Sequence, residues 1–301
     1  MRALIVGASG FVGRALSTHL LATGDEVIAP VRADGGPDVT DRDGVHRFVD
    51  ASEPDVVYHL AAQSHVPSSW SDPIGTLRVN VEGTQNVLDA ARAAGDARVI
   101  VVSSAEVYGS VNVDDLPIDE DAPLRPLNPY AASKVAADAI ALQAHLGNGQ
   151  DVIRLRSFNH FGPGQSTRFV CAGLAHRIAR AERDDTTHIE VGALDVRRDF
   201  SDVRDIVRAY RCVAEHGVAG QAYNICSGID RSIREIADGL RALSLQAFEY
   251  EPAVELQRPI DTPIVRGSSE RVSRDTGWQP EIPIEASLAD ILNDARERLD
   301  D

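Results

Sequence analysis

The stretch Arg2-Ala3-Leu4-Ile5-Val6-Gly7-Ala8-Ser9-Gly10-Phe11-Val12-Gly13 decides the fold of this chain. Its apolar part, Leu4-Ile5-Val6, is typical of a short buried strand in a parallel sheet. Three glycines follow at G-x-x-G-x-x-G spacing, and the next residues, to about Leu21, predict a helix. A glycine turn between a strand and a helix is the context in which this pattern binds the pyrophosphate of a dinucleotide.

Each glycine has a distinct role in such a turn. Gly7 permits the tight turn, Gly10 lets the backbone approach the pyrophosphate, and Gly13 lets the helix pack closely on the strand. The free N–H groups at the helix N-terminus then face the phosphates. We therefore expect cofactor contacts from this turn, by Gly7, Ser9, Gly10, Phe11, Val12 and Gly13.

A second signal, Asn128-Pro129-Tyr130-Ala131-Ala132-Ser133-Lys134, begins with a residue that can cap a helix and a proline suited to its first turn. Tyr130 and Lys134 then lie one helical turn apart on the same face. A free phenol has a pKa of about 10, and we expect the nearby ammonium to lower it. Ser104, which ends an apolar strand, is expected to hold a substrate oxygen. Together these groups predict acid–base work in hydride transfer to or from an alcohol or ketone.

The first half of the chain alternates short apolar segments with helical ones. Strands are predicted at 2–6, 26–31, 55–60, 98–103 and 151–155, and helices near 11–22, 41–51, 75–95 and 129–146. This alternation predicts an α/β fold with a doubly wound parallel sheet of the Rossmann type. We expect a dinucleotide-binding domain over 1–158 and a smaller substrate-binding lobe over 159–301. A segment near 199–226, which contains the apolar run 222–225, is expected to return to the main sheet.

Composition narrows the class of protein. With 301 residues and 43% hydrophobic residues, the chain is expected to be globular. No apolar run approaches the length of a membrane span and no signal peptide opens the sequence, so we expect a cytoplasmic protein. The net charge of −16 disfavours nucleic acid or an anionic membrane as a partner. The three cysteines have no metal-ligand spacing, and we expect no metal site.

The end of the second predicted strand bears on the choice of nicotinamide cofactor. An acid there favours NAD, whereas an arginine favours the 2′-phosphate of NADP. No acid follows until Asp34, and Arg32 is well placed, so we favour NADP and keep NAD as the alternative. Contacts to adenine are expected from Asp38 and Val39. Small residues beside the pyrophosphate and nicotinamide ribose are expected at Leu60, Ala61 and Ala62.

The chain resembles the extended short-chain dehydrogenase/reductases that act on nucleotide sugars. The motifs that carry this resemblance are Gly7–Gly13, His59-Leu60-Ala61-Ala62-Gln63, Asn80-Val81-Glu82-Gly83-Thr84, Ser103-Ser104-Ala105-Glu106-Val107-Tyr108-Gly109 and Tyr130–Lys134. In the second half, Arg156-Ser157-Phe158-Asn159-His160-Phe161-Gly162-Pro163-Gly164-Gln165 is similar to the R-P-F-N-H-x-G-P-G-Q of members that act on GDP-sugars, with serine in place of proline. The segment Arg197–Asp205 resembles their R-D-F-x-D-V-x-D.

The resemblance implies a reaction and a set of substrate contacts. The reaction is reduction by NAD(P)H of the C4 ketone of a GDP-4-keto-6-deoxy-hexose, giving GDP-D-rhamnose. The catalytic residues that the resemblance implies are Tyr130, Lys134, Ser104 and Glu106. Tyr130 and Lys134 would also contact the cofactor, Lys134 at the nicotinamide ribose. Substrate contacts are implied for Ser104, Ala105 and Glu106, and contacts to the diphosphate for Asn159, Arg198 and Arg258.

One position separates related chemistries. A 4,6-dehydratase places an acid or a second hydroxyl, then a glutamate, after the catalytic hydroxyl residue, whereas this chain has Ala105 and then Glu106. Alanine cannot protonate a leaving hydroxyl, which favours a reductase over a dehydratase. Glu106 is either a hydrogen-bond acceptor for the sugar or an anchor for its neighbours.

Other readings of the same motifs stay open. They are a nucleotide-sugar 4-epimerase that keeps its NAD bound, a 4,6-dehydratase, and a non-catalytic NADP-sensing regulator. The family habit also predicts a homodimer built from helices near 78–94 and 130–146. Apolar residues expected on the outer face of these helices are Val79, Val87, Leu88, Val135, Ile140 and Leu142.

Overall fold

The computed structural model describes residues 1–30, 36–95, 97–253, 256 and 262–300. Its strands are β1 (Arg2–Val6), β2 (Glu26–Ile28), β3 (Val56–His59), β4 (Arg98–Ser104), β5 (Val152–Ser157), β6 (Asn159–Phe161), β7 (His188–Val191), β8 (Arg197–Asp202), β9 (Ala222–Ile225), β10 (Asp230–Ser232), β11 (Glu249–Pro252) and β12 (Ile264–Val265). Its α-helices are α1 (Phe11–Ala22), α2 (Arg42–Ser52), α3 (Val66–Ser71), α4 (Pro73–Leu77), α5 (Gly83–Ala93), α6 (Pro129–Asn148), α7 (Val170–Asp184), α8 (Val203–His216), α9 (Ile233–Ala242), α10 (Glu270–Thr276) and α11 (Ile284–Asp300). A π-helical turn, η2 (Arg78–Glu82), and two 3-10 turns, η3 (Ala105–Tyr108) and η4 (Val113–Asp115), complete the secondary structure of these residues.

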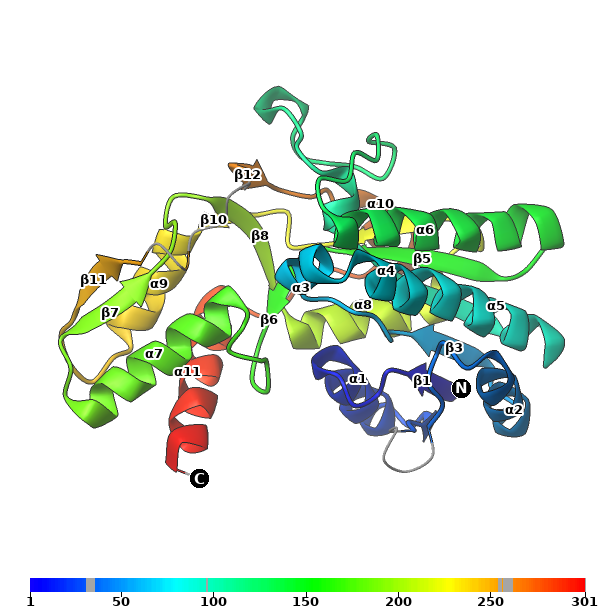
Figure 1. Ribbon diagram of the computed structural model, residues 1–301, viewed down its shortest axis with the longest axis horizontal. Coiled ribbons are helices and arrows are strands. Elements are labelled where there is room, and N and C mark those ends of the chain that lie inside the picture. The colour runs from blue at the N-terminus through cyan, green and yellow to red at the C-terminus, as the bar shows by residue number, and fades with distance from the viewer. Residues whose placement is uncertain (31–35, 96, 254–255, 257–261, 301) are drawn as a thin grey trace.

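The main sheet has six parallel strands in the order β2-β1-β3-β4-β5-β9. Helices α1 and α8 pack on one face, and α2, α5 and α6 cover the other, so the sheet lies between two helical layers (Figure 1). Side chains on both faces are therefore buried, which is why β1 and β3 read as nearly continuous apolar runs. The structure confirms the predicted doubly wound Rossmann-type sheet.

A smaller lobe lies beside the main sheet, at the left of Figure 1. Its sheet contains β10, β8 and β12, with β6 also paired to β8, and β11 pairs with β7. Helices α7, α9 and α11 enclose a separate core there. The chain then returns to the main sheet, because β9 pairs in parallel with β5. The exact division into two domains stays a prediction. None of the helices in the described ranges is long and apolar enough to span a membrane.

The long helix predicted at 75–95 is interrupted. The structure has α4, the π-helical turn η2 and then α5 over this segment. The expectation that Val87 and Leu88 lie on an outer face is also wrong, because both are fully buried in the core formed by the sheet with α2 and α6. The exposed apolar residues of this region come from α3 and α4 instead, namely Trp70 (58% exposed), Ile74 (61%) and Leu77 (38%).

The glycine turn offers a test of packing between α1 and the first strand. A Cβ atom at Gly13 would lie 2.3 Å from the Gly7 carbonyl oxygen and 2.7 Å from the Ala8 Cα. A Cβ atom at Gly10 meets only the Gly7 oxygen, at 3.3 Å. We expect Gly13→Ala to lower the free energy of unfolding by about 1–3 kcal/mol, the usual cost of overpacking. Urea unfolding measures this, with Gly10→Ala as the matched control. Equal losses in the two variants would contradict the packing argument.

Candidate functional site

Three of the predicted residues meet at the carboxyl end of the main sheet. Helix α6 begins after Asn128, whose Oδ1 accepts a hydrogen bond from the Ala131 N–H at 2.8 Å. Its first turns place Tyr130 and Lys134 on the buried side, where they are 8% and 7% exposed. Ser104, the last residue of β4, hydrogen-bonds to the Tyr130 phenol. Lys134 donates from Nζ to the Val102 carbonyl oxygen at 2.7 Å, so the ammonium is anchored to the same strand.

The acid–base properties of this trio differ from the expectation. Burial raises the pKa of Tyr130 to about 12, the Ser104 hydrogen bond offsets part of that rise, and the charge of Glu106 adds to it. The expectation that Lys134 lowers the phenol pKa is therefore wrong for this structure. Burial also lowers the pKa of Lys134 to about 8. Desolvation governs both groups, because both are enclosed by protein.

The residues after Ser104 form the 3-10 turn η3. Ala105 is buried there, and Glu106 is partly exposed. The Glu106 Oε2 atom accepts a hydrogen bond from Asn128 Nδ2 at 3.1 Å, and the Glu106 N–H donates to the Ser104 Oγ at 3.2 Å. Glu106 therefore ties η3 to the cap of the helix that carries Tyr130.

The glycine turn lies against the segment 60–62, which was also predicted to bind the cofactor. Gly7 has a φ of +100°, and a Cβ atom there would lie 2.6 Å from the Ala61 nitrogen. The N–H groups of Leu60 and Ala61 donate to the Val6 carbonyl oxygen at 2.8 and 2.9 Å. Ala62 follows directly and is half-buried. Close backbone approach thus brings the two segments together.

The N-terminus of α1 fits a diphosphate. Its N-cap, Gly10, supplies no side-chain acceptor for the first N–H groups of the helix, and both Ser9 and Gly10 are exposed. The next residues, Phe11 and Val12, are half-buried in the first turn, and Gly13 is buried against the strand. An exposed helix terminus with unsatisfied N–H groups favours an anion.

The remaining predicted cofactor contacts have mixed outcomes. Asp38 Oδ1 accepts hydrogen bonds from the Thr40 N–H and hydroxyl at 3.0 and 2.9 Å. Val39 is buried, and its carbonyl oxygen accepts from Asn86 Nδ2 at 2.8 Å. Arg32, on which the preference for NADP was based, lies outside the described residues.

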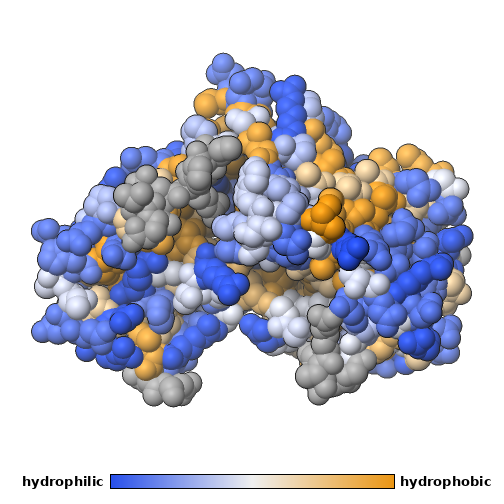
Figure 2. All heavy atoms as spheres, in the orientation of Figure 1, coloured by the Kyte–Doolittle hydropathy of each residue, from blue (hydrophilic) through white to orange (hydrophobic). Residues whose placement is uncertain are grey.

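The smaller lobe reaches the glycine turn through the motif 156–165. His160 stacks on Phe11, with ring centroids 6.3 Å apart and planes 8° from parallel. Its Nδ1 donates to the Phe158 carbonyl oxygen at 2.8 Å, and burial lowers its pKa, so the ring is held neutral. Asn159 is exposed at the start of β6. Figure 2 shows the surface hollowed between the two lobes.

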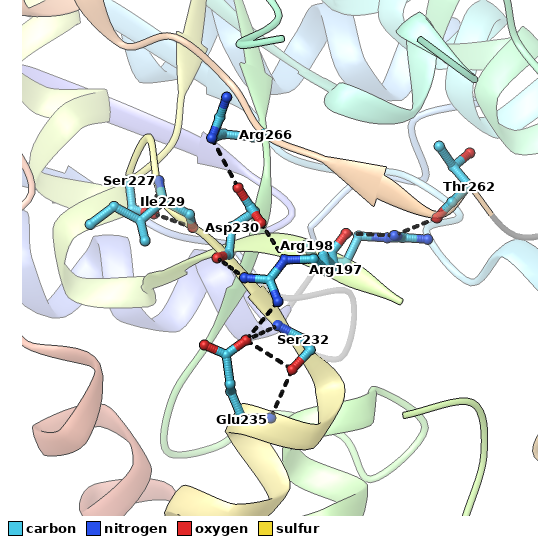
Figure 3. A network of polar contacts seen from close by, with 9 residues as sticks. All are labelled: Arg197, Arg198, Ser227, Ile229, Asp230, Ser232, Glu235, Thr262 and Arg266. Carbon is cyan, nitrogen blue, oxygen red and sulfur yellow. Dashed lines mark hydrogen bonds and ion pairs between the residues drawn. The ribbon is translucent and has the colours of Figure 1, made fainter. Parts of the chain in front are cut away.

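The arginines implied for the diphosphate belong to the smaller lobe. Arg198 is nine-tenths buried on β8, and its Nη1 donates to the carbonyl oxygens of Arg197 and Thr262, both at 2.7 Å (Figure 3). The preceding residue, Arg197, is held by the carboxylates of Asp230 and Glu235. Arg258 lies outside the described residues.

The prediction missed a polar bridge between the cofactor segment and α6. Asn80, in the π-helical turn η2, accepts a hydrogen bond from the Gln63 N–H at 2.8 Å. Its Nδ2 donates to the Gln63 carbonyl oxygen at 3.0 Å and to the Ser133 Oγ at 2.8 Å. The sequence offers as a signal an asparagine inside a predicted helix, whereas the burial of Asn80 and its π-helical turn are seen only in the structure. The bridge fixes the segment after β3 against the helix of Tyr130.

Residues 3–226 match the model of the NAD dependent epimerase/dehydratase family, and the chain therefore belongs to that family. It is similar to the GDP-6-deoxy-D-mannose reductase of Pseudomonas aeruginosa, with 40% identity over 99% of this chain and 98% of that one. The structure of RMD from Pseudomonas aeruginosa complexed with NADPH has a TM-score of 0.92 and covers 98% of this chain and 99% of its own, at 40% identity. The UDP-glucose 4-epimerase of Thermus thermophilus, complexed with NAD, is 27% identical, with a TM-score of 0.87 and coverage of 98% and 99%.

Lys134 offers a direct test of the buried site. It is the only lysine in the chain, so the side chain gives a single NMR signal when lysine is ¹³C-labelled. We expect that signal to titrate with a pKa of about 8 in the folded, nucleotide-free protein. In urea it should titrate near 10.5, the ordinary value. Because the folded pKa is the lower one, folding releases a proton between these values, and stability should rise with pH across that window.

Lys134→Met is the control for this prediction. The variant has no ammonium to bury, so its stability advantage over the wild type should be greatest below pH 8 and shrink toward pH 10.5. Urea unfolding at pH 7, 9 and 10.5 measures the difference. A folded-state titration near 10.5 would contradict burial of the charge.

Proposed function

We propose that this chain is an NADPH-dependent GDP-4-dehydro-6-deoxy-D-mannose reductase, which converts the C4 ketone of its substrate to the alcohol of GDP-D-rhamnose. The observation that carries the proposal is the grouping of the buried Tyr130 and Lys134 with the half-buried Ser104, which is followed in the chain by Ala105 in place of an acid. Similarity to the Pseudomonas aeruginosa reductase over almost the whole chain supports the same conclusion.

The cofactor in this proposal is NADPH, held at its pyrophosphate by the glycine turn and the N-terminus of α1. When bound, it supplies the hydride. Support comes from the RMD structure, which is complexed with NADPH, and from the exposed, uncapped terminus of α1. Lys134 would hold the nicotinamide ribose. The preference of this chain for NADP through Arg32 stays a prediction.

The raised pKa of Tyr130 suits the reductive direction. A phenol with a pKa of about 12 is protonated at neutral pH, so it is ready to give a proton. As the C4 carbonyl carbon gains the hydride, its oxygen takes the Tyr130 proton, and the phenolate left behind accepts a hydrogen bond from Ser104. The sugar therefore gains a hydride and a proton, which balances the reduction.

The same segment argues against elimination of water. Dehydration across C5 and C6 requires an acid for the leaving hydroxyl, and Ala105 has none. Glu106 is engaged by Asn128, which supports a role in holding η3 and in accepting a hydrogen bond from the sugar. Asn159, Arg198 and Arg258 are proposed to bind the diphosphate. A cytoplasmic location stays a prediction.

The assay uses purified protein with preformed GDP-4-keto-6-deoxymannose and either NADPH or NADH. We expect oxidation of the reduced cofactor and GDP-D-rhamnose as the product, identified by NMR. Tyr130→Phe should lower kcat by roughly 10²–10⁴-fold, the usual worth of general acid catalysis, with an unchanged Kd for NADPH. Near-normal kcat in the variant would contradict the assignment of Tyr130. Release of bound NAD on denaturation would favour the epimerase, and conversion of GDP-mannose to the 4-keto-6-deoxy sugar would favour the dehydratase.

We also propose that the chain forms a homodimer. The interface would lie at the exposed apolar residues of α3 and α4, because Val87 and Leu88, which were expected to form it, are buried. On the face shown in Figure 2, apolar side chains gather over the region of α4. Trp70, Ile74 and Leu77 are exposed there, and both α3 and α4 pack against α6. A second copy that covers this patch would bury side chains that are otherwise costly to leave in water.

Ile74→Asp tests the dimer. A charge in the centre of an apolar interface should shift the protein from dimer to monomer at micromolar concentration, as measured by light scattering. Leu245→Asp is the matched control, because Leu245 is 81% exposed in the other lobe and should not affect assembly. A monomeric wild type, or equal effects of the two variants, would contradict this surface.

A further inference from the structure

Arg156, on β5, joins the two segments that carry the acid–base groups. It is 4% exposed, and its Nε and Nη2 donate to the two carboxylate oxygens of Asp138 at 2.9 and 3.1 Å. Asp138 lies on α6, one helical turn after Lys134. The Arg156 Nη1 points the other way, to the Tyr108 hydroxyl at 3.0 Å and the Glu120 carbonyl oxygen at 2.9 Å. One buried guanidinium thus contacts both α6 and the end of η3.

The Tyr108 hydroxyl continues this connection. It accepts from Arg156 and donates its single proton to Asn224 Oδ1 at 2.7 Å, so the direction of each bond is determined. The Arg156 guanidinium also lies 5.3 Å from the centre of the Tyr108 ring. Asn224, on β9, donates from Nδ2 to the Ile118 carbonyl oxygen at 3.0 Å. Tyr108 is therefore held by Arg156 and Asn224 together, and it closes the turn that begins directly after Ser104.

We propose that Tyr108 is a positioning residue, whose hydroxyl, held by Arg156 and Asn224, sets the place of Ser104 and Glu106 relative to Tyr130. The inference deepens the proposed reductase function and rests on it for the kinetic readout alone. Ser104 and Glu106 act on the Tyr130 phenol in opposite senses, the first lowering its pKa and the second raising it. A small displacement of η3 against α6 changes both effects together.

The anchor of α6 does not depend on Tyr108. Arg154 donates from Nη1 to Asp138 Oδ1 at 2.7 Å, so Asp138 keeps two arginines when the Tyr108 hydroxyl is removed. Tyr108→Phe therefore loosens η3 and leaves the helix of Tyr130 and Lys134 in place. This asymmetry separates a positioning role from a general contribution to the fold.

The experiment compares Tyr108→Phe with Tyr223→Phe. Tyr223 is fully buried, and its hydroxyl also makes two hydrogen bonds, accepting from the Val218 N–H at 3.0 Å and donating to Asp275 at 2.9 Å. It points to the opposite face of β9 from Asn224. We expect Tyr108→Phe to lower kcat on the order of 10-fold, since misplacement by about 1 Å can cost 10²-fold, with KM for the sugar and Kd for NADPH unchanged. Tyr223→Phe should leave kcat at the wild-type value.

Two further measurements distinguish the outcomes. Hydrogen exchange of the nucleotide-free protein should be faster at 104–109 in Tyr108→Phe and unchanged there in Tyr223→Phe, a readout that needs no turnover. In a Ser104→Ala background, Tyr108→Phe should lower kcat by a smaller factor than it does in the wild type, because the part of its effect that passes through Ser104 is already lost. If Tyr108→Phe does not fold, Arg156→Lys, which keeps the cation but loses the Nη1 donor to the Tyr108 hydroxyl, should show the same faster hydrogen exchange at 104–109.

Equal behaviour of the two tyrosine variants, or an undiminished effect of Tyr108→Phe in the Ser104→Ala background, overturns the inference. A wild type that fails to reduce the ketosugar overturns the proposed function, and the exchange experiment still decides the positioning of η3.

Discussion

The close approach of backbone to backbone at Gly7 and Gly13 is the constraint on which the rest of the site depends. Because neither position has room for a Cβ atom, the first strand, α1 and the segment after β3 come within contact distance of one another. The N-terminus of α1 thereby lies at the carboxyl edge of the sheet, where β4 ends in Ser104 and the first turn of α6 carries Tyr130. Phe11 then provides the surface on which His160 of the smaller lobe stacks. The glycine turn, the acid–base groups and the smaller lobe therefore meet at the same edge of the main sheet.

The features that depend on residues close together in the chain were predicted correctly from the sequence. The first strand, the glycine turn, α1 and the Asn128 cap of α6 were all found from neighbours in sequence, and Ser104 and Tyr130 do meet. The pKa of Tyr130 was missed because it depends on how fully distant segments enclose the phenol. Val87 and Leu88 were placed on the wrong face because a helix covered on several sides has no outer apolar stripe to read. The π-helical turn at Asn80 depends on Gln63 and Ser133, which no periodicity of the helix itself reveals.

The return of the chain to the main sheet has a consequence for the surroundings of η3. The six-stranded sheet is complete only when β9 pairs with β5, and β9 follows β6, α7, β7, β8 and α8 in the chain. Pairing between segments that are distant in the chain costs more loop-closure entropy than pairing between neighbours. Asn224 sits on this last strand and receives the Tyr108 proton. The environment of η3 is therefore complete only when the last strand of the main sheet in chain order is in place.

Burial of the only lysine gives the molecule an unusual chemical surface. Apart from Lys134, every basic residue among the 30 is an arginine, and the one ε-amine is enclosed beside β4. The N-terminal amine is bound to Asp25 at 2.8 Å. Enzymes that acetylate lysine, or that attach ubiquitin-like proteins to it, thus find no exposed side-chain amine on this protein. Amine-directed cross-linkers would therefore react with the N-terminal amine. They would react with Lys134 only when they can enter the site between the two lobes.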